Sequence, residues 1–167
     1  FSPEARMQGI KLKWAPYKRP SPECAPVHSK AAGLYMICTL SKHEAEAEGF
    51  DDALMLDWRG QLAETTGANV FLVIDGVIHT PTPDCFLDGI TRRSVMGLAR
   101  KHGIKIIERA IMPDELSKAD EVFVTGTAAE VTPVGQIADM KFTVGPVTKT
   151  LLEDYDRLVR EPVDATT

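Results

Sequence analysis

The strongest constraint on how this chain folds comes from four prolines in one short segment: Pro16, Pro20, Pro22 and Pro26. Each proline fixes its own φ angle and lacks the backbone N–H that a helix or a sheet ladder requires. Regular helix is therefore excluded between Ala15 and His28, and we expect an extended loop there. The elements before and after this loop must form separately and be joined by it.

A strand is predicted before the loop and a helix after it. Residues 7 to 15 alternate in part between apolar and charged side chains, which is the period-2 pattern of a half-buried strand. Ser29 suits the N-cap of a helix over residues 30 to 48, which Gly49 would end. Lys30 would then lie where the loop meets the positive end of the helix. The apolar face of this helix is expected to hold Ala32, Tyr35, Met36, Thr39 and Leu40.

The rest of the chain alternates between strand and helix patterns. Asp75-Gly76 is a strong hairpin turn signal between two of the expected strands. Strands are predicted over residues 52–58, 61–64, 69–74, 77–79, 104–111 and 121–125. Helices are predicted over residues 94–102, 113–118 and 146–159, the last opened by Pro146. The pattern indicates an α+β fold, with a meandering sheet and helices on its outside.

Composition excludes several classes of function. The 167 residues are 44% hydrophobic and carry a formal net charge of −5, with no basic stripe, so neither nucleic acid nor an anionic membrane is expected as a partner. No apolar run approaches the roughly 18 to 20 residues that span a bilayer. Three cysteines far apart, and histidines without ligand spacing, predict neither disulfides nor a metal site. We expect a cytoplasmic protein.

Several side chains together could hold pyridoxal phosphate. Lys30 offers an amine for an imine, the Tyr35 phenol a hydrogen bond to the ring oxygen, and Glu64 a carboxylate for the ring nitrogen. Each also has an ordinary explanation. A lone lysine is most often a solvated surface charge, a tyrosine on an apolar helix face is often part of the core, and a glutamate at a strand end is often exposed.

Two Gly-Thr turns could bind the phosphate. Backbone N–H groups around Gly89, Ile90 and Thr91 precede a predicted helix, whose positive end attracts anions. A second turn contains Thr127. A glycine and a threonine before a helix also fit an ordinary N-cap, so the first turn alone is a weak signal.

These residues resemble the branched-chain amino acid aminotransferases of the class IV pyridoxal-phosphate family. The likeness includes the Lys-Ala-x-x-x-Tyr run that begins at Lys30 and the string Val-Thr-Gly-Thr-Ala-Ala-Glu-Val-Thr-Pro at residues 124 to 133. It extends from about Gly9 to the last predicted helix. Thr65 departs from the glycine that many members have there, which leaves the local turn geometry open.

The resemblance implies a fold and a domain organisation. The fold is that of the larger C-terminal domain of fold type IV enzymes, also found in D-amino-acid aminotransferase, with a barrel-like sheet and outer helices. Residues 1–28 would be an interdomain strand with the Pro-rich connector, and residues 29–167 the cofactor-binding domain. The likeness begins in the middle of a family member, so we expect a fragment that lacks the N-terminal domain.

The resemblance also implies an activity. Lys30 would carry pyridoxal 5'-phosphate and act as general base and acid in transamination between leucine, isoleucine or valine and 2-oxoglutarate. Tyr35, Glu64, Ile90, Thr91 and Thr127 would bind the cofactor, and the N–H groups of Ala128 and Ala129 would bind the substrate carboxylate. A homodimer or higher homo-oligomer is expected.

Three alternatives stay open. Two are D-amino-acid aminotransferase and aminodeoxychorismate lyase, which share the fold and keep the lysine and glutamate. The small residues Gly126, Ala128 and Ala129 and the Gly-Pro-Val-Thr-Lys run from Gly145 favour the branched-chain group over both. The third alternative is a truncated domain that folds but has no turnover.

Overall fold

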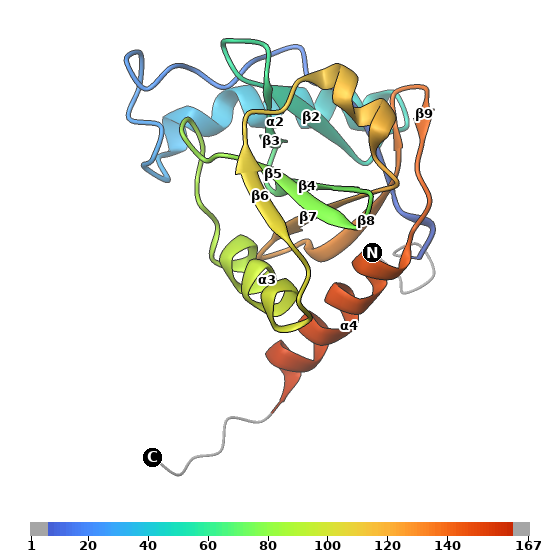
Figure 1. The fold of residues 1–167 in the computed structure, drawn as a ribbon. Coiled ribbons are helices and arrows are strands. Elements are labelled where there is room, and N and C mark those ends of the chain that lie inside the picture. The colour runs from blue at the N-terminus through green and yellow to red at the C-terminus, as the bar shows by residue number, and fades with distance from the viewer. Residues whose placement is uncertain (1–6, 162–167) are drawn as a thin grey trace.

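The computed structural model describes residues 7–161, which fold around one nine-stranded sheet (Figure 1). Its strands follow the order β3-β2-β1-β8-β7-β4-β5-β6. Because β3 also pairs with β4, the first six strands in this order close into a barrel, and β5 and β6 extend it. The strands are β1 (Ile10–Trp14), β2 (Asp52–Leu56), β3 (Leu62–Thr65), β4 (Asn69–Ile74), β5 (Val77–Pro81), β6 (Ile106–Arg109), β7 (Glu121–Gly126), β8 (Glu130–Ile137) and β9 (Met140–Lys141), which pairs with β8.

The alternation of side chains along β4 divides the core into two clusters. Val70 and Leu72 join the apolar cluster to which all six barrel strands contribute. Phe71 and Val73 point to the opposite face and join a second cluster with residues of two helices. Phe71 stacks there on Phe123 of β7, with ring centroids 4.9 Å apart. The outer face of the barrel thus carries an apolar cluster of its own under these two helices.

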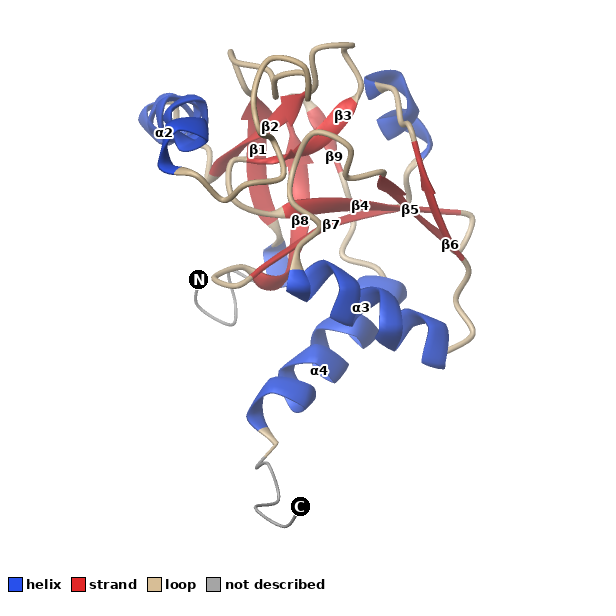
Figure 2. Cartoon of the chain, turned by 90° about the vertical axis from the view of Figure 1, so that its left-hand side faces the viewer, coloured by secondary structure: helices blue, strands red, loops and turns tan. Residues whose placement is uncertain are grey.

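In the part of the chain that the structure describes, helices α2 (Ala32–Ala47), α3 (Ile90–Lys101) and α4 (Pro146–Arg160) and the 3-10 helix η1 (Pro113–Lys118) lie outside the sheet (Figure 2). Helices α3 and α4 pack together against the outer cluster, while α2 lies at a different part of the barrel, beside β2. The 3-10 helix η1 contributes Leu116 to the barrel cluster. The expected α+β architecture with a barrel-like core and outer helices is confirmed. Within residues 7–161 no helix is long and apolar enough to cross a membrane.

The predicted hairpin and most predicted elements are confirmed. β4 has the predicted bounds, and the turn to β5 has positive φ at both Asp75 (49°) and Gly76 (74°), the geometry that favours this residue pair. The short helix at residues 113–118 is the 3-10 helix. Helix α3 begins at Ile90 rather than at Ser94, so Thr91 is a helical residue and does not precede the helix.

The predicted N-cap of α2 is wrong. Ser29 donates its backbone N–H to the Pro26 carbonyl at 2.9 Å and so completes a turn, and extended Ala31 is the N-cap instead. The first helical residue is Ala32. Lys30 therefore precedes the N-cap by one residue, on the loop side of the junction.

The predicted apolar face of α2 is also wrong. The helix buries its small residues Cys38, Ser41 and Ala45, whereas Met36 and Leu40 stay exposed. Small side chains let the helix approach β2 closely. The predicted residues do share one face of the helix, with the spacing of a single stripe, but that face is exposed and the helix turns a different face toward the barrel. Cys38 is a buried free cysteine.

The strand before the Pro-rich loop lies inside the sheet. β1 pairs in parallel with β2 on one side and with β8 on the other. The Pro-rich loop is also tied down, because the Arg19 N–H donates to the Leu56 carbonyl at 2.8 Å and Val27 joins a small apolar cluster with Ala63 of β3. Residues 7–28 therefore pack on the same barrel as the residues that follow them. The domain boundary at residue 28 stays a prediction.

Candidate functional site

A cavity of about 480 Å³ opens between the outer face of the barrel, the start of α3 and the loop before α2. Six residues predicted to hold a cofactor line it together: Lys30, Tyr35, Glu64, Ile90, Thr91 and Thr127. Ala128 and Ala129 follow in the turn between β7 and β8 and are not among the lining residues. The fold thus brings the predicted cofactor residues into one cavity from sites far apart in the sequence.

Lys30 and Tyr35 lie at the mouth of the cavity. Both are exposed, Lys30 in the loop just before α2 and Tyr35 on the first turn of that helix. An amine and a phenol at the mouth are accessible to a ligand that enters the cavity. Glu64, Asn69 and Thr125 lie deeper, since all three are buried.

Glu64 is held by two partners. Its Oε1 lies 3.0 Å from Arg19 Nη2, and its Oε2 accepts a hydrogen bond from Asn69 Nδ2 at 3.3 Å. Burial raises the pKa of Glu64 to about 8, because the lost hydration of the carboxylate outweighs the opposing attraction of the Arg19 guanidinium. Near neutral pH this carboxyl can therefore carry a proton and present it to a basic atom in the cavity.

Arg19 was not predicted as a site residue. This residue lies in the Pro-rich loop, yet its side chain is buried, lines the cavity and donates from Nη1 to Cys38 Sγ at 3.4 Å as well as pairing with Glu64. The only available signal was a single cation in a loop that carries other charges. Nothing in the sequence showed that the loop folds back over β3.

The start of α3 presents free N–H groups to the cavity. Gly89 is the N-cap, no described side chain caps this helix, and Ile90 and Thr91 are its first two residues. The first N–H groups of a helix have no acceptor within it, and the helix dipole adds positive potential there, so this end suits an anion such as a phosphate. The Thr91 hydroxyl lies 3.4 Å from the Tyr155 hydroxyl of α4.

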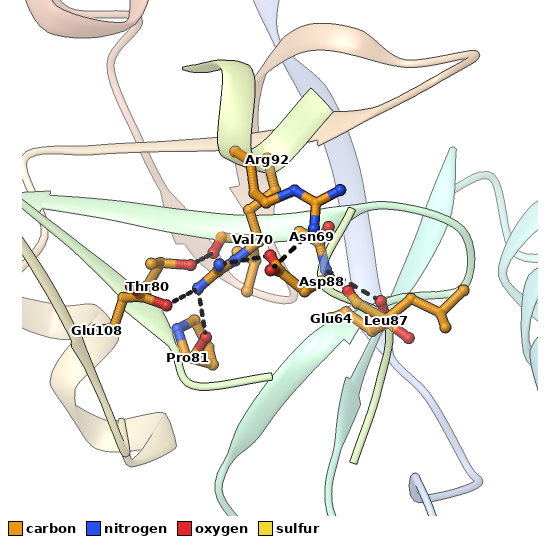
Figure 3. A network of polar contacts seen from close by, with 10 residues as sticks. Glu64, Asn69, Val70, Thr80, Pro81, Leu87, Asp88, Arg92 and Glu108 are labelled. Carbon is orange, nitrogen blue, oxygen red and sulfur yellow. Dashed lines mark hydrogen bonds and ion pairs between the residues drawn. The ribbon is translucent and has the colours of Figure 1, made fainter. Parts of the chain in front are cut away.

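Arg92 fixes this helix start in place (Figure 3). Its Nη1 donates to Asp88 at 2.9 Å, and its Nη2 donates to Glu108 at 2.8 Å and to the Pro81 carbonyl at 3.2 Å. The side chain is almost completely buried, so these bonds tie the first turn of α3 to the ends of β5 and β6. Their role is structural, since Arg92 does not line the cavity.

Thr125 offers a further polar group at the base of the cavity. It is fully buried, lines the cavity, and its hydroxyl has no hydrogen-bond partner among the described residues. A buried hydroxyl without a partner is uncommon and destabilising, which is consistent with a site that a polar ligand completes. Together with the buried carboxyl of Glu64 and the N–H groups of α3, it fits a group with a basic ring atom and a phosphate.

A second group of polar residues lies outside this cavity. Asp57, Asp84 and Cys85 have ligand-type atoms within 4.8 Å of one another. Arg59 already pairs with both carboxylates, at 2.7 Å and 2.6 Å, and burial raises the pKa of the Cys85 thiol to about 12. We interpret this group as an ion-pair cluster.

The amino-acid sequence matches the model of the amino-transferase class IV family over residues 1–137. It is 41% identical over 165 residues to the branched-chain-amino-acid aminotransferase of Pseudomonas aeruginosa, and 37% identical over 156 residues to that of Escherichia coli strain K12. These matches cover 97% and 91% of this chain, but 54% and 50% of the relatives. The chain therefore spans about half the length of the curated relatives it matches.

Solved structures resemble the fold closely. The T.th. branched-chain amino acid aminotransferase with pyridoxamine 5'-phosphate has a TM-score of 0.91 at 41% identity, covering 94% of this chain and 53% of that one. An aminotransferase from Brucella abortus bound to the cofactor PLP has a TM-score of 0.87 at 36% identity, and the match covers 95% of this chain and 57% of that one. The expected fold, that of the cofactor-binding domain of fold type IV enzymes, is confirmed.

Proposed function

This chain belongs to the class IV aminotransferase family, and we propose that its cavity binds pyridoxal phosphate and that Lys30 carries the cofactor during transamination of branched-chain amino acids. The observation that supports the proposal most is the meeting of Lys30, Tyr35, Glu64, Thr91 and Thr127 around one cavity. Relatives named branched-chain-amino-acid aminotransferase support the reaction class.

Pyridoxal phosphate, when bound, supplies an aldehyde that condenses with amines and a conjugated ring that withdraws electrons from the substrate α-carbon. The exposed Nζ of Lys30 would hold it covalently at the cavity mouth. Once substrate has displaced this amine, Lys30 would take the proton from the α-carbon and later return one, acting as general base and acid.

The other residues would orient the cofactor. The Tyr35 phenol would donate a hydrogen bond to the ring oxygen, and the buried carboxyl of Glu64 would hold a proton at the ring nitrogen. The N–H groups of Ile90 and Thr91, with the hydroxyls of Thr91 and Thr127, would bind the phosphate. The N–H groups of Ala128 and Ala129 stay the proposed contacts of the substrate carboxylate.

Three parts of the proposal rest on the resemblance to the family described above. The substrates would be leucine, isoleucine and valine, with 2-oxoglutarate as acceptor. The working protein would be a homodimer or higher homo-oligomer in the cytoplasm. Since the chain spans about half of these relatives, residues outside this chain would complete the substrate pocket.

Covalent binding of the cofactor tests the proposal directly. Pyridoxal phosphate is added to the purified protein, the adduct is reduced with borohydride, and the labelled peptide is mapped. We expect the label on Lys30, and its loss in Lys30→Ala but not in Lys18→Ala, which removes another exposed lysine. A label elsewhere, or equal labelling of the two variants, would contradict the assignment.

Turnover is measured separately, as glutamate formed from 2-oxoglutarate with each branched-chain L-amino acid and with its D-isomer. Glutamate from the L-isomers supports the branched-chain assignment, whereas activity confined to the D-isomers would favour the sister family. Labelling of Lys30 without turnover would mean that the chain binds the cofactor but is not itself a complete enzyme.

A further inference from the structure

Asn69 occupies a position between the two ends of the proposed cofactor site. It is the first residue of β4 and is buried, with 5% of its surface exposed. In the sheet it lies directly opposite Glu64 of β3 on one side and Thr125 of β7 on the other. Residues opposite each other in antiparallel strands point to the same face, so these three side chains form a row on the cavity side of the barrel.

The amide nitrogen of Asn69 makes two hydrogen bonds. Nδ2 donates to Glu64 Oε2 at 3.3 Å and to the Leu87 carbonyl at 3.0 Å (Figure 3). The other carboxylate oxygen of Glu64 faces Arg19. Asn69 therefore helps to set the orientation of the Glu64 carboxyl, and the same NH₂ group holds the loop that leads into α3.

The amide oxygen of Asn69 lies against the N-cap of α3. A Cβ atom placed on Gly89 would lie 2.5 Å from Asn69 Oδ1, closer than real Cβ atoms approach an oxygen. The backbone angles of Gly89 lie in the ordinary extended region, which any residue can adopt. Glycine is therefore required here for lack of space beside Asn69 and not for its backbone conformation. The two ends of one amide thus touch the Glu64 carboxyl and the glycine of the phosphate turn.

We propose that Asn69 is a positioning residue that couples the Glu64 carboxyl to the Gly89 turn, so that the ring end and the phosphate end of the cofactor site are set together. This inference rests on the proposed function. Asn69 acts through its neighbours, since both of its hydrogen bonds are to protein groups. A substitution that displaces the Gly89 turn should consequently change the environment of the Glu64 carboxyl, and the reverse should also hold.

Two variants test this coupling from opposite sides. Asn69→Ala removes both hydrogen bonds, and Gly89→Ala pushes a methyl group into the amide oxygen. Two readouts are taken on the purified protein: the dissociation constant of pyridoxal phosphate, which reports the phosphate end, and the pH midpoint of the visible absorption of the bound cofactor, which reports the ring end. We expect each variant to weaken binding roughly tenfold or more, in keeping with the loss of one to two buried hydrogen bonds, and to shift the midpoint.

Matched controls separate positioning from general loss of stability. Thr80→Val removes a buried hydrogen bond to the Val70 carbonyl in the neighbouring strand (Figure 3), and Gly97→Ala adds a methyl group to α3 where no atom lies within 4 Å. Both should leave the dissociation constant and the midpoint at wild-type values. Equal shifts in Thr80→Val and Asn69→Ala would show that Asn69 acts through stability alone and would overturn the proposal.

The double variant gives the sharpest result. With Asn69 replaced by alanine, the methyl group of Gly89→Ala no longer meets an amide oxygen, so the second substitution should add little to the first. Additive effects would overturn the coupling. A shift in the midpoint caused by Gly89→Ala alone would support it even if Asn69→Ala did not fold, whereas an unchanged midpoint would contradict it. If wild-type protein takes up no pyridoxal phosphate, the proposed function fails instead, and the two failures are distinct.

Discussion

Replacing Glu64 by glutamine should make the stability of the cofactor-free protein less dependent on pH, by an amount that follows from burial. Burial raises the pKa of this carboxyl from 4.5 to about 8. Between these values the folded chain holds a proton that the unfolded chain has released. The stabilisation is therefore complete below the lower pKa and is lost as pH rises through the upper one. At about 1.36 kcal/mol per pH unit, the wild type loses about 2 to 3 kcal/mol between pH 5 and pH 7 that the variant keeps.

The measurement is urea unfolding of both proteins at these two pH values, followed by the fluorescence of Trp14 and Trp58. At both pH values the folded wild type holds Glu64 mainly in its protonated form, so glutamine replaces one neutral partner of Arg19 by another, and any cost of this exchange cancels in the comparison. Glu153→Gln, on the exposed side of α4, controls for removing one negative charge. A wild-type-minus-variant difference that does not change with pH would show that Arg19 keeps Glu64 ionised throughout, and would refute the reasoning.

Two further substitutions probe the phosphate turn and the last helix. Thr127→Ala should weaken pyridoxal phosphate binding about tenfold to a hundredfold, the usual worth of a hydrogen bond to a charged group, while Thr39→Ala on the exposed face of α2 should not. Unchanged affinity in a direct titration would remove Thr127 from the site. Glu121→Ala should cost about 1 to 2 kcal/mol in urea unfolding, because this carboxylate accepts two N–H groups at the start of α4, the nearer at 2.7 Å. A loss no larger than that of Glu153→Ala would contradict this capping role.

Residues in short local motifs could be predicted from the sequence. Lys30 and Tyr35 share one run at the start of a helix, and Thr91 and Thr127 each belong to a Gly-Thr turn. Their chemical roles could therefore be predicted from short sequence motifs, without knowledge of the fold. The resemblance to a family then indicated that they belong to one cofactor site. That six such residues line one cavity is a property of the closed barrel, because β3 must pair with β4 for Glu64 to come near the others.

Residues whose role depends on strand register could not be predicted in the same way. Asn69 begins a strand with the predicted bounds, but its contacts with Leu87 and Gly89 arise from a loop that returns to the barrel some twenty residues later. Arg19 could not be predicted either, because its contact with Glu64 arises only when the Pro-rich loop packs on the barrel. β8 was missed because Pro133 and Gly135 interrupt its pattern, and the pairing with β1 and β7 on its two sides is what holds it as a strand.

The outer face of the β4–β7 pair explains why the cavity lies where it does. Three cross-strand pairs follow one another on this face: Asn69 with Thr125, Phe71 with Phe123, and Val73 with Glu121. The aromatic pair in the middle lies under α3 and α4. At one end Asn69 meets the N-cap of α3, and at the other end Glu121 accepts N–H groups from the start of α4. Polar residues thus stand where each helix begins. At α4 a carboxylate satisfies the helix start, whereas at α3 no described side chain accepts the first N–H groups, which suits the anion site proposed there.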